Sequence, residues 1–370
     1  MKFTCKKSTL VSAISVASRT VAVKNPIPAL EGIHVKAGNY LYLTGFNLET
    51  GITVKLDAEI QEFGECVFPA RLFFDIIRKM PDDEVSVSVD ENLIASIRSG
   101  ISFFNITAMD ASDYPELPDV DSEKGVSIAQ DVLREMISGT IFSASDNQAR
   151  PIHTGCLFEV ENDSVTVVAV DGYRLARRTF HPEKPTERSM RFVVPAAALK
   201  EVEKILADTD EEAIFTLGRK HILFEIGNAT LVCRILEGEF LDWRRVVPSN
   251  NPIKLTANVG EITDSIERVG LIVSEKIKSP VRCRFSENSA DFKTSTTIGN
   301  AHDCCTLAGD GTDLEIGFNC KYLLDALRAV PTEEVTLELS NSLSPIVLTP
   351  ADDKYDFAYM VLPVRLKVGE

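Results

Sequence analysis

The side chains that most often perform catalysis or bind metals are dispersed along this 370-residue chain. No segment matches the phosphate-binding loop G-x-x-x-x-G-K-[ST], the dinucleotide fingerprint G-x-G-x-x-G, the zinc motif H-E-x-x-H or the nucleophile elbow G-x-S-x-G. The histidines lack metal-ligand spacing: they are His34, His153, His181, His221 and His302. Carboxylates are plentiful, but a surplus of them usually forms a solvated surface. We therefore predict a protein that is not an enzyme and that uses no cofactor and no metal.

The eight cysteines do not form a recognisable site either. They include no C-x-x-C pair, so a zinc site is not expected. Most lie in apolar stretches, where a free cysteine behaves as a small hydrophobic residue. The neighbours Cys304 and Cys305 are a candidate redox pair, but alternation along a strand would place one of them in the core in any case.

Length and composition indicate a large globular protein of more than one domain. At roughly 150 residues per domain, the chain suggests two or three domains, and its 44% hydrophobic content can fill their cores. No apolar run approaches the ~20 residues that span a bilayer, and the N-terminus lacks the apolar segment of a signal peptide. We therefore expect a cytoplasmic protein with no membrane partner. The net charge of −16 argues by itself against nucleic acid, because phosphate contacts need Lys and Arg.

The strongest signal is a pattern that occurs three times, in residues 66–77, 192–202 and 316–327. Each segment is an apolar strand followed by an amphipathic helix, then an acidic turn and alternating strands at residues 84–89, 213–217 and 334–339. The matching residues Phe68, Val194 and Phe318 are 126 and 124 positions apart. In two segments a proline, Pro69 or Pro195, occupies the expected first helical position, where its missing N–H had no intrahelical partner.

A second strand and helix pattern also repeats, in residues 3–21, 126–142 and 255–272. Each third of the chain therefore holds two strand–helix–strands units, with Pro-rich or acidic boundaries near residues 121 and 249. This predicts an α+β fold of three domains, residues 1–121, 122–249 and 250–370, with helices on one face of the sheets. A chance likeness of ordinary α+β domains is the alternative.

Several of these motifs together resemble the β subunit family of bacterial DNA polymerase III. The most specific are DGYRLA (residues 171–176) and YMVLPVRL (residues 359–366). Supporting pieces are LTG (43–45) with LE (48–49), DYP (113–115), FE (158–159) and WRRV (243–246). The likeness covers the whole chain. It implies a DNA-clamp fold in which two chains close a six-domain ring as a head-to-tail homodimer, with helices lining the hole.

The resemblance makes the distribution of charge more important than its total. The expected lining segments are residues 7–20, 69–79, 128–142, 195–207, 260–273 and 320–330, which carry +2, +2, −1, 0, −2 and +1. They total +2, which leaves −18 for the rest of the chain. A weakly positive lining suits sliding, because non-specific phosphate contacts carry no sequence information and an acidic exterior repels DNA. Merely amphipathic helices would give the same count.

The resemblance implies three groups of site residues. Those expected to face DNA are Lys7, Arg19, Lys24, Arg71, Arg78, Lys79, Asn147, Arg150, Lys200, Lys204, Lys321 and Arg328. Those expected at the dimer interface are Phe104 and Ile106, meeting Leu271 and Ile272. Those expected to form a partner-peptide cleft are His153, Val170, Gly172, Tyr173, Arg174, Leu175, Leu241, Arg245, Val246, Pro345, Met360, Leu362, Pro363, Val364, Arg365 and Leu366.

Such a cleft combines an apolar anchor cavity with polar groups that orient a bound peptide. Its expected occupants are the polymerase III catalytic subunit, the clamp loader and other replication and repair factors. Without the resemblance, residues 170–173 are a strand ending in an Asp-Gly turn, and residues 361–366 are an edge strand that contains a proline. His153 and Leu241 differ from common family residues, and residues 367–370 extend past the usual end.

Three functions follow from the sequence. The leading one is a sliding clamp that encircles duplex DNA without sequence preference and tethers the polymerase, which confers processivity through effective concentration. The second is a repeat-built interaction scaffold that does not encircle DNA. The third is an enzyme using scattered carboxylates, for which the sequence offers no acid–base pair.

Overall fold

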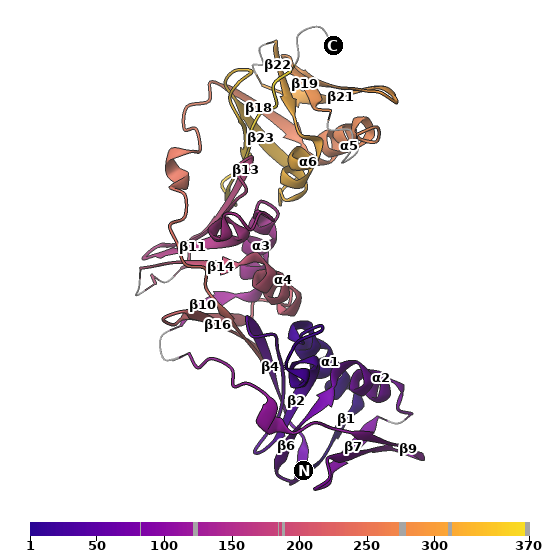
Figure 1. The fold of residues 1–370 in the computed structure, drawn as a ribbon. Helices are drawn as coiled ribbons and strands as arrows, with labels where there is room; N and C mark the ends of the chain where they lie inside the picture. Colours follow the sequence, from indigo (N-terminus) through magenta and orange to yellow (C-terminus); the bar gives the residue numbers. More distant parts are fainter. Residues whose placement is uncertain are drawn as a thin grey trace. The chain divides into compact units, whose positions relative to one another are not determined.

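The structure is a computed structural model that describes residues 1–81, 83–120, 125–183, 185–186, 189–273, 279–309 and 313–366. The chain forms two compact units (Figure 1). Unit 1 comprises Met1–Leu133 and Glu201–Ile235, and unit 2 comprises Arg134–Lys200 and Leu236–Glu370. The C-terminal extension 367–370 lies outside the described residues, and the division at residues 121 and 249 stays a prediction.

Unit 1 contains two antiparallel sheets. The smaller has the order β5-β1-β7-β8-β9 and the larger β10-β15-β16-β17-β4-β3-β2-β6. Burial alternates along β1, β8 and β16, as expected for sheets that are covered on one face. The strands are β1 Lys2–Lys6, β2 Gly32–Ala37, β3 Leu41–Phe46, β4 Thr50–Leu56, β5 Glu59–Glu62, β6 Gly64–Pro69, β7 Glu84–Val89, β8 Ile94–Ser99, β9 Ser102–Thr107, β10 Val126–Ala129, β15 Glu212–Leu217, β16 His221–Ile226 and β17 Ala229–Arg234.

Unit 2 contains one sheet of twelve strands, in the order β14-β11-β12-β13-β25-β24-β23-β18-β21-β20-β19-β22. A core cluster in the C-terminal third includes the aromatic residues Phe285, Phe292, Phe318 and Tyr359. The strands are β11 Gly155–Glu161, β12 Ser164–Val170, β13 Arg174–Phe180, β14 Met190–Pro195, β18 Ile253–Asn258, β19 Val281–Phe285, β20 Ser289–Thr296, β21 Gly299–Ala308, β22 Leu314–Phe318, β23 Glu334–Leu339, β24 Ile346–Pro350 and β25 Asp356–Val361.

Each repeated segment provides one helix, as the sequence predicts. The helices are α1 Lys7–Ala17, α2 Ala70–Lys79, α3 Gln130–Ile141, α4 Ala196–Ile205, α5 Val259–Gly270 and α6 Cys320–Arg328. The predicted position of the two prolines is wrong by one residue. Pro69 and Pro195 are the last residues of β6 and β14, and the helices begin at the following alanines. Their fixed φ suits the extended strand end equally well, and proline at a strand end loses little ladder bonding.

The repeat extends to single backbone bridges. Isolated bridges join Val67 to Met109, Val193 to Leu236 and Gly317 to Val364. The first partners are 126 and 124 positions apart and the second partners 127 and 128, as in the sequence pattern. The predicted α+β architecture with three repeats is therefore confirmed.

Neighbouring repeats are joined by hydrogen bonding between sheet edges. In unit 1, β4 of the first repeat pairs with β17 of the second. In unit 2, β13 of the second repeat pairs with β25 of the third. β4 and β13 are the second strands of equivalent hairpins in their repeats, so the two junctions are built in the same way.

The cysteines behave as hydrophobic residues. All eight are free, and all but Cys304 are buried. Cys304 and its neighbour Cys305 point to opposite faces of β21, which confirms the expected alternation. Burial raises the pKa of five of these thiols to about 12, so they are poorly reactive at neutral pH: Cys5, Cys66, Cys156, Cys233 and Cys305. Within the described residues, no helix is long and apolar enough to cross a membrane.

Gly45 in β3 lies against the end of α1, and this contact is tightly packed. A Cβ atom built on Gly45 would lie 1.9 Å from the carbonyl oxygen of Ala17, and the Gly45 carbonyl accepts a hydrogen bond from the Thr20 hydroxyl at 2.8 Å. We expect Gly45→Ala to destabilise the protein by about 1–3 kcal/mol, because backbone must move to admit the methyl group. Urea unfolding measures the loss. Gly38→Ala is the matched control, because no atom lies within 4 Å of that Cβ position. Equal urea midpoints for the two variants would contradict the conclusion that the contact between Gly45 and α1 leaves no room for a methyl group.

Candidate functional site

The Asp-Gly turn between β12 and β13 has a well-defined geometry. The Asp171 carboxylate accepts hydrogen bonds from the backbone N–H groups of Tyr173 at 2.8 Å and Arg174 at 3.1 Å. Gly172 has φ +94°, a conformation that residues with a Cβ atom rarely adopt. The turn leaves the Tyr173 side chain 62% exposed. The predicted strand and Asp-Gly turn are thus present.

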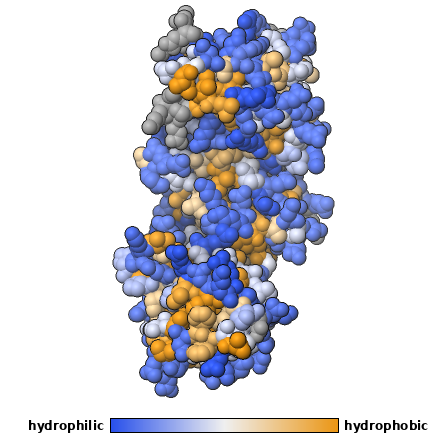
Figure 2. Space-filling model, turned by 90° about the vertical axis from the view of Figure 1, so that its right-hand side faces the viewer, coloured by the Kyte–Doolittle hydropathy of each residue, from blue (hydrophilic) through white to orange (hydrophobic). Residues whose placement is uncertain are grey.

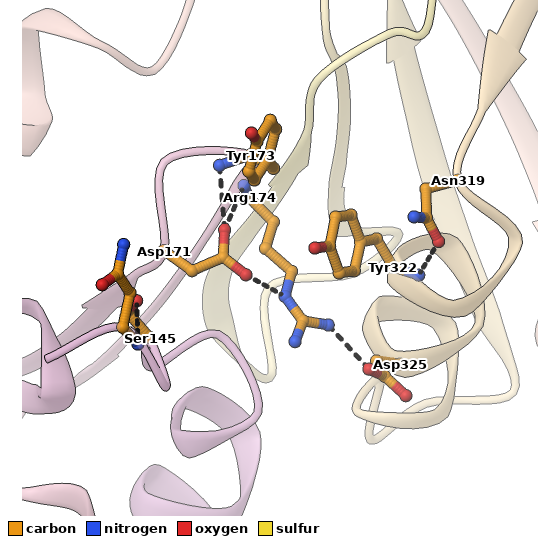
Figure 3. Close-up of polar contacts among 8 residues, drawn as sticks. Ser145, Asp171, Tyr173, Arg174, Asn319, Tyr322 and Asp325 are labelled. Atoms are coloured by element: carbon orange, nitrogen blue, oxygen red, sulfur yellow. Dashed lines mark hydrogen bonds and ion pairs between the residues drawn. The ribbon is translucent and has the colours of Figure 1, made fainter. Parts of the chain in front are cut away.

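The Arg174 guanidinium is held by two carboxylates rather than extended into solvent (Figure 3). Nε donates to Asp171 at 2.9 Å, and Nη1 donates to Asp325 of α6 at 2.6 Å. The guanidinium also lies over the Tyr322 ring, 4.5 Å from its centroid, and Tyr173 stacks on Tyr322 at 6.1 Å. Because breaking a buried ion pair is costly, Arg174 fastens this turn to α6. Its place in a partner-peptide cleft stays a prediction.

The C-terminal segment crosses from β25 to the other edge of the third repeat. Leu362 donates its N–H to the Tyr173 carbonyl at 2.9 Å, and Val364 donates to the Gly317 carbonyl at 2.7 Å. A side chain on Gly317 would meet the Val364 carbonyl at 2.8 Å and the Leu366 side chain at 2.5 Å. Residues 362–366 are therefore held at both ends, and β25 itself ends at Val361. The predicted edge strand over residues 361–366 is reduced to one isolated bridge, because Pro363 lacks an N–H to donate.

A buried apolar cluster lies beneath these segments. It contains three residues of the predicted cleft, Val170, Leu175 and Met360, together with Phe240 and Val347. Leu175 and Met360 are opposite one another in the β13–β25 ladder, which explains why residues 185 positions apart meet. The structure therefore brings together three of the apolar residues that were expected to form the partner-peptide cleft.

Two 3₁₀ helices supply further predicted residues. The helix Trp243–Arg245 precedes Val246, and Trp243 packs on the apolar cluster while its Nε1 donates to Glu159 at 2.9 Å. Arg245 is 86% exposed and pairs with Asp242 at 2.9 Å. In the helix Pro151–Thr154, His153 packs edge-on against Phe240, with ring centroids 5.6 Å apart. Burial, with a contribution from Arg150, lowers the pKa of His153, so this ring is neutral at pH 7.

The rim above the cluster exposes apolar side chains from three separate chain segments. Clusters of exposed apolar groups on a charged protein commonly mark binding sites. Pro345 is half-buried beside the cluster residue Val347, and Arg365 is exposed at the end of the rim. The exposed large hydrophobic residues of the rim are Tyr173, Leu241, Val246, Leu362 and Val364.

A cavity of about 740 Å³ opens beside the C-terminal segment, with Val364 in its lining. The start of α6 contributes Asn319, Lys321 and Tyr322, and Asn319 caps the helix by accepting from the Tyr322 N–H at 3.3 Å. Four residues here were not among the predicted site residues, namely Asn319, Tyr322, Asp325 and Phe240, and Trp243 was identified only as part of the WRRV motif. The single tryptophan beside two arginines was an available signal for Trp243, whereas nothing local indicated that α6 approaches residues 171–174.

The residues expected to face DNA lie on helices and loops. Some of their charged groups are already bound within the chain, and others are exposed without a carboxylate partner. Lys7 donates to the Met80 carbonyl at 2.6 Å. Arg19 and Lys204 both pair with Glu201, Arg78 pairs with Asp75, and Arg328 pairs with Glu267. Asn147 caps its own loop by accepting from the Ala149 N–H at 3.0 Å. Among the residues expected to face DNA, six exposed cations have no carboxylate partner in the described part of the chain: Lys24, Arg71, Lys79, Arg150, Lys200 and Lys321.

The expected interface residues lie on two different units. Phe104 and Ile106 are in β9, the edge strand of the five-stranded sheet in unit 1. Leu271 and Ile272 follow α5 in unit 2, and Leu271 is 83% exposed. Figure 2 shows hydrophobic residues gathered at the lower end of the view, where Figure 1 places the N-terminal part of unit 1. The described residues contain no group of three or more His, Cys, Asp or Glu side chains able to hold a metal.

Three family models match the chain in sequence. They describe the N-terminal, central and C-terminal domains of the DNA polymerase III beta subunit and match residues 1–118, 127–242 and 244–365. The beta sliding clamp of Staphylococcus epidermidis is 32% identical over 381 aligned positions, which cover 99% of each chain. That of Staphylococcus aureus is 31% identical over 376 positions, again with 99% of each chain covered.

Solved structures agree with the sequence matches. A putative DNA polymerase III beta subunit from Eubacterium rectale superimposes with a TM-score of 0.93 at 32% identity, covering 98% of this chain and 99% of that one. The DNA polymerase sliding clamp of Bacillus subtilis gives a TM-score of 0.94 at 29% identity, covering 99% and 100%. The chain therefore belongs to the family of bacterial DNA polymerase III beta subunits, the beta sliding clamps, which are non-catalytic processivity factors.

Proposed function

We propose that two copies of this chain close around duplex DNA as a sliding clamp, and that the edges of β9 and β21 form the closing contact. One observation carries this proposal. At both junctions within the chain, the last strand of one repeat (β17 or β25) pairs with the second strand of the equivalent hairpin in the preceding repeat, β4 or β13. The corresponding strands left over are β9 and β21. β9 is a sheet edge, and β18 meets β21 only at Leu307 and Ala308 in the described residues.

The internal junctions also support one register for this contact. The hairpin pairs Ser99–Ser102 and Ile226–Ala229 align β9 with β17, so Phe104 corresponds to Leu231. The pairs Phe46–Gly51 and Ser295–Asn300 align β4 with β21, so Ile52 corresponds to Ala301.

Leu231 lies opposite Ile52 in the existing ladder, so we place Phe104 opposite Ala301 of a second copy. The same alignment places Ile106 opposite Gly299. Phe104 pairs within its own sheet with the buried Ile97, and Ala301 packs on the core of unit 2. Both side chains therefore point to the helix-covered face, where Leu271 and Ile272 follow α5. This agreement of faces supports the interface, because a shift of one residue would turn every side chain to the opposite face.

The charges support loose rather than tight contact with DNA. Of the eleven cations expected to face DNA, four are already paired with carboxylates. Lys7 donates to a backbone carbonyl, and the other six are exposed on separate helices and loops. Each free cation adds a salt-dependent phosphate contact without sequence preference. The acidic remainder of a chain of net charge −16 repels DNA from the outside.

The apolar rim supports binding of an extended peptide from the polymerase III catalytic subunit, the clamp loader and other replication and repair factors. Exposed aromatic and aliphatic side chains over a rigid apolar cluster provide anchor positions, and Arg245 and Arg365 provide polar contacts. We infer a cytoplasmic location from this function. A scaffold that does not encircle DNA has no specific observation in its favour.

The first prediction concerns topology. A clamp loader should place the protein on nicked circular plasmid, where it stays during gel filtration. Linearising the plasmid should release it, because a closed ring slides off ends. Uncut plasmid is the control. Equal retention on circular and linear DNA would contradict encirclement.

The second prediction concerns ring closure. Phe104→Asp should raise the dimer dissociation constant by about tenfold or more, because it places a charge on the covered face of the interface. Sedimentation velocity over a concentration series measures the change. Phe103→Asp is the matched control on the opposite, exposed face of β9. If the control weakens the dimer as much as Phe104→Asp does, the register is incorrect.

The third prediction concerns the peptide rim. Tyr173→Ala and Leu362→Ala should each weaken binding of the polymerase catalytic subunit by about tenfold, since truncated anchor residues commonly cost that much. Surface plasmon resonance measures the affinity, and sedimentation verifies that the dimer is intact. Leu48→Ala, in the matching turn of the first repeat, should have no effect. Unchanged affinity in both rim variants would exclude these residues as anchors.

A further inference from the structure

A cavity of about 290 Å³ opens at the β4–β17 junction in unit 1. Its walls come from α1, β4, the end of α4 and the turn between β16 and β17. The lining includes the apolar residues Val16, Val54, Leu56 and Ile226, and also Ser12 and Glu211, whose side chains carry oxygen atoms. No predicted contact with DNA, partner peptide or a second copy involves this cavity's apolar wall.

The second junction shows what occupies the corresponding space. The hairpin pairs Phe46–Gly51 and Val170–Leu175 align β4 with β13, so Val54 corresponds to Arg178. The first helical residues of α1 and α3 are Lys7 and Gln130, so Ser12 corresponds to Glu135. Those of α4 and α6 are Ala196 and Cys320, so Ile205 corresponds to Ala329.

At the second junction, the Arg178 side chain fills this space and is 7% exposed. Its guanidinium donates to the Tyr359 hydroxyl at 3.0 Å, the Glu135 carboxylate at 3.3 Å and the Ala329 carbonyl at 3.4 Å. It also lies 5.8 Å from the centroid of the Phe357 ring. At this junction the Arg178 guanidinium is therefore bound by a hydroxyl, a carboxylate and a carbonyl of the same chain.

At the first junction the position that corresponds to Arg178 is Val54. Its side chain is too short to reach the hydrogen-bond acceptors around the cavity. The Ile205 carbonyl belongs to the last turn of α4, where carbonyls lack intrahelical partners and the helix dipole favours a cation. Ser12 contributes a hydroxyl where the second junction has Glu135, and Glu211 adds a carboxylate to the lining. Lys204 also lines the cavity, but its ammonium is held by Glu201 at 2.8 Å.

We infer that this cavity is a binding site for an alkylguanidinium group, with the apolar stem against Val16 and Val54 and the guanidinium at Ile205, Ser12 and Glu211. The planar guanidinium suits several carbonyl and carboxylate acceptors at once, and the aliphatic stem suits the apolar wall. The group can belong to a free small molecule or to an arginine side chain of another protein. This inference does not depend on the proposed function.

The test titrates the full-length protein with butylguanidinium and with N-butylurea, its neutral isostere, by isothermal titration calorimetry. We expect saturable binding of butylguanidinium and at least tenfold weaker binding of N-butylurea. N-acetyl-arginine amide distinguishes the two sources: binding as tight as that of butylguanidinium assigns the site to an arginine side chain, and weaker binding assigns it to a small molecule. Absence of saturable binding by all three probes would overturn the inference.

Two variants localise the binding. Ser12→Glu restores the carboxylate of the second junction at an exposed helix position and should tighten butylguanidinium binding by about two- to fivefold, whereas the matched Ser12→Gln should not. Val54→Arg should fill the cavity from within and abolish binding. If Val54→Arg does not fold, the Ser12 pair decides alone. Equal affinity in Ser12→Glu and Ser12→Gln would place the ligand elsewhere.

Discussion

Hydrogen bonding between the sheet edges of successive repeats is the interaction on which the rest of this structure depends. A free strand edge exposes unpaired backbone groups and must be paired, covered or used. Here β4 pairs with β17, and β13 pairs with β25, in ladders of five and six residue pairs. Each pairing continues a sheet from one repeat into the next. The remaining edges are the surfaces that a second copy can complete.

The junctions share a backbone arrangement but differ in their side chains, and this difference gives them different surfaces. The second junction contains Arg174 between Asp171 and Asp325, and Arg178 against Tyr359. These buried pairs fasten a turn and a helix on which an apolar rim is built. The first junction has Val54 and Leu231 at two of the corresponding positions and leaves a cavity. The repeat therefore determines the backbone arrangement, and the different side chains at matched positions determine the local surface.

The acidic composition is compatible with a DNA-encircling protein because charge is distributed unevenly. Cations on the helices are few, and several are neutralised by neighbouring carboxylates such as Glu201 and Glu267. A protein that must move along DNA benefits from weak contacts, whereas a tight phosphate clamp would hold it in place. The net charge alone would have excluded the correct class of partner.

The sequence by itself determined the repeat and the helix of each unit, because these features follow local periodicity and spacing. Val170, Leu175 and Met360 were selected through the resemblance of their motifs to the polymerase III β subunit family, and the structure places all three in one apolar cluster. Only the tertiary structure decided where Arg174 points, that Tyr322 and Asp325 approach it, and that Trp243 is held by Glu159. Arg174 and Asp325 are 151 positions apart. No local pattern encodes such a pair, because the ladder between β13 and β25 brings their segments together, and the partners that a long side chain finds depend on that packing.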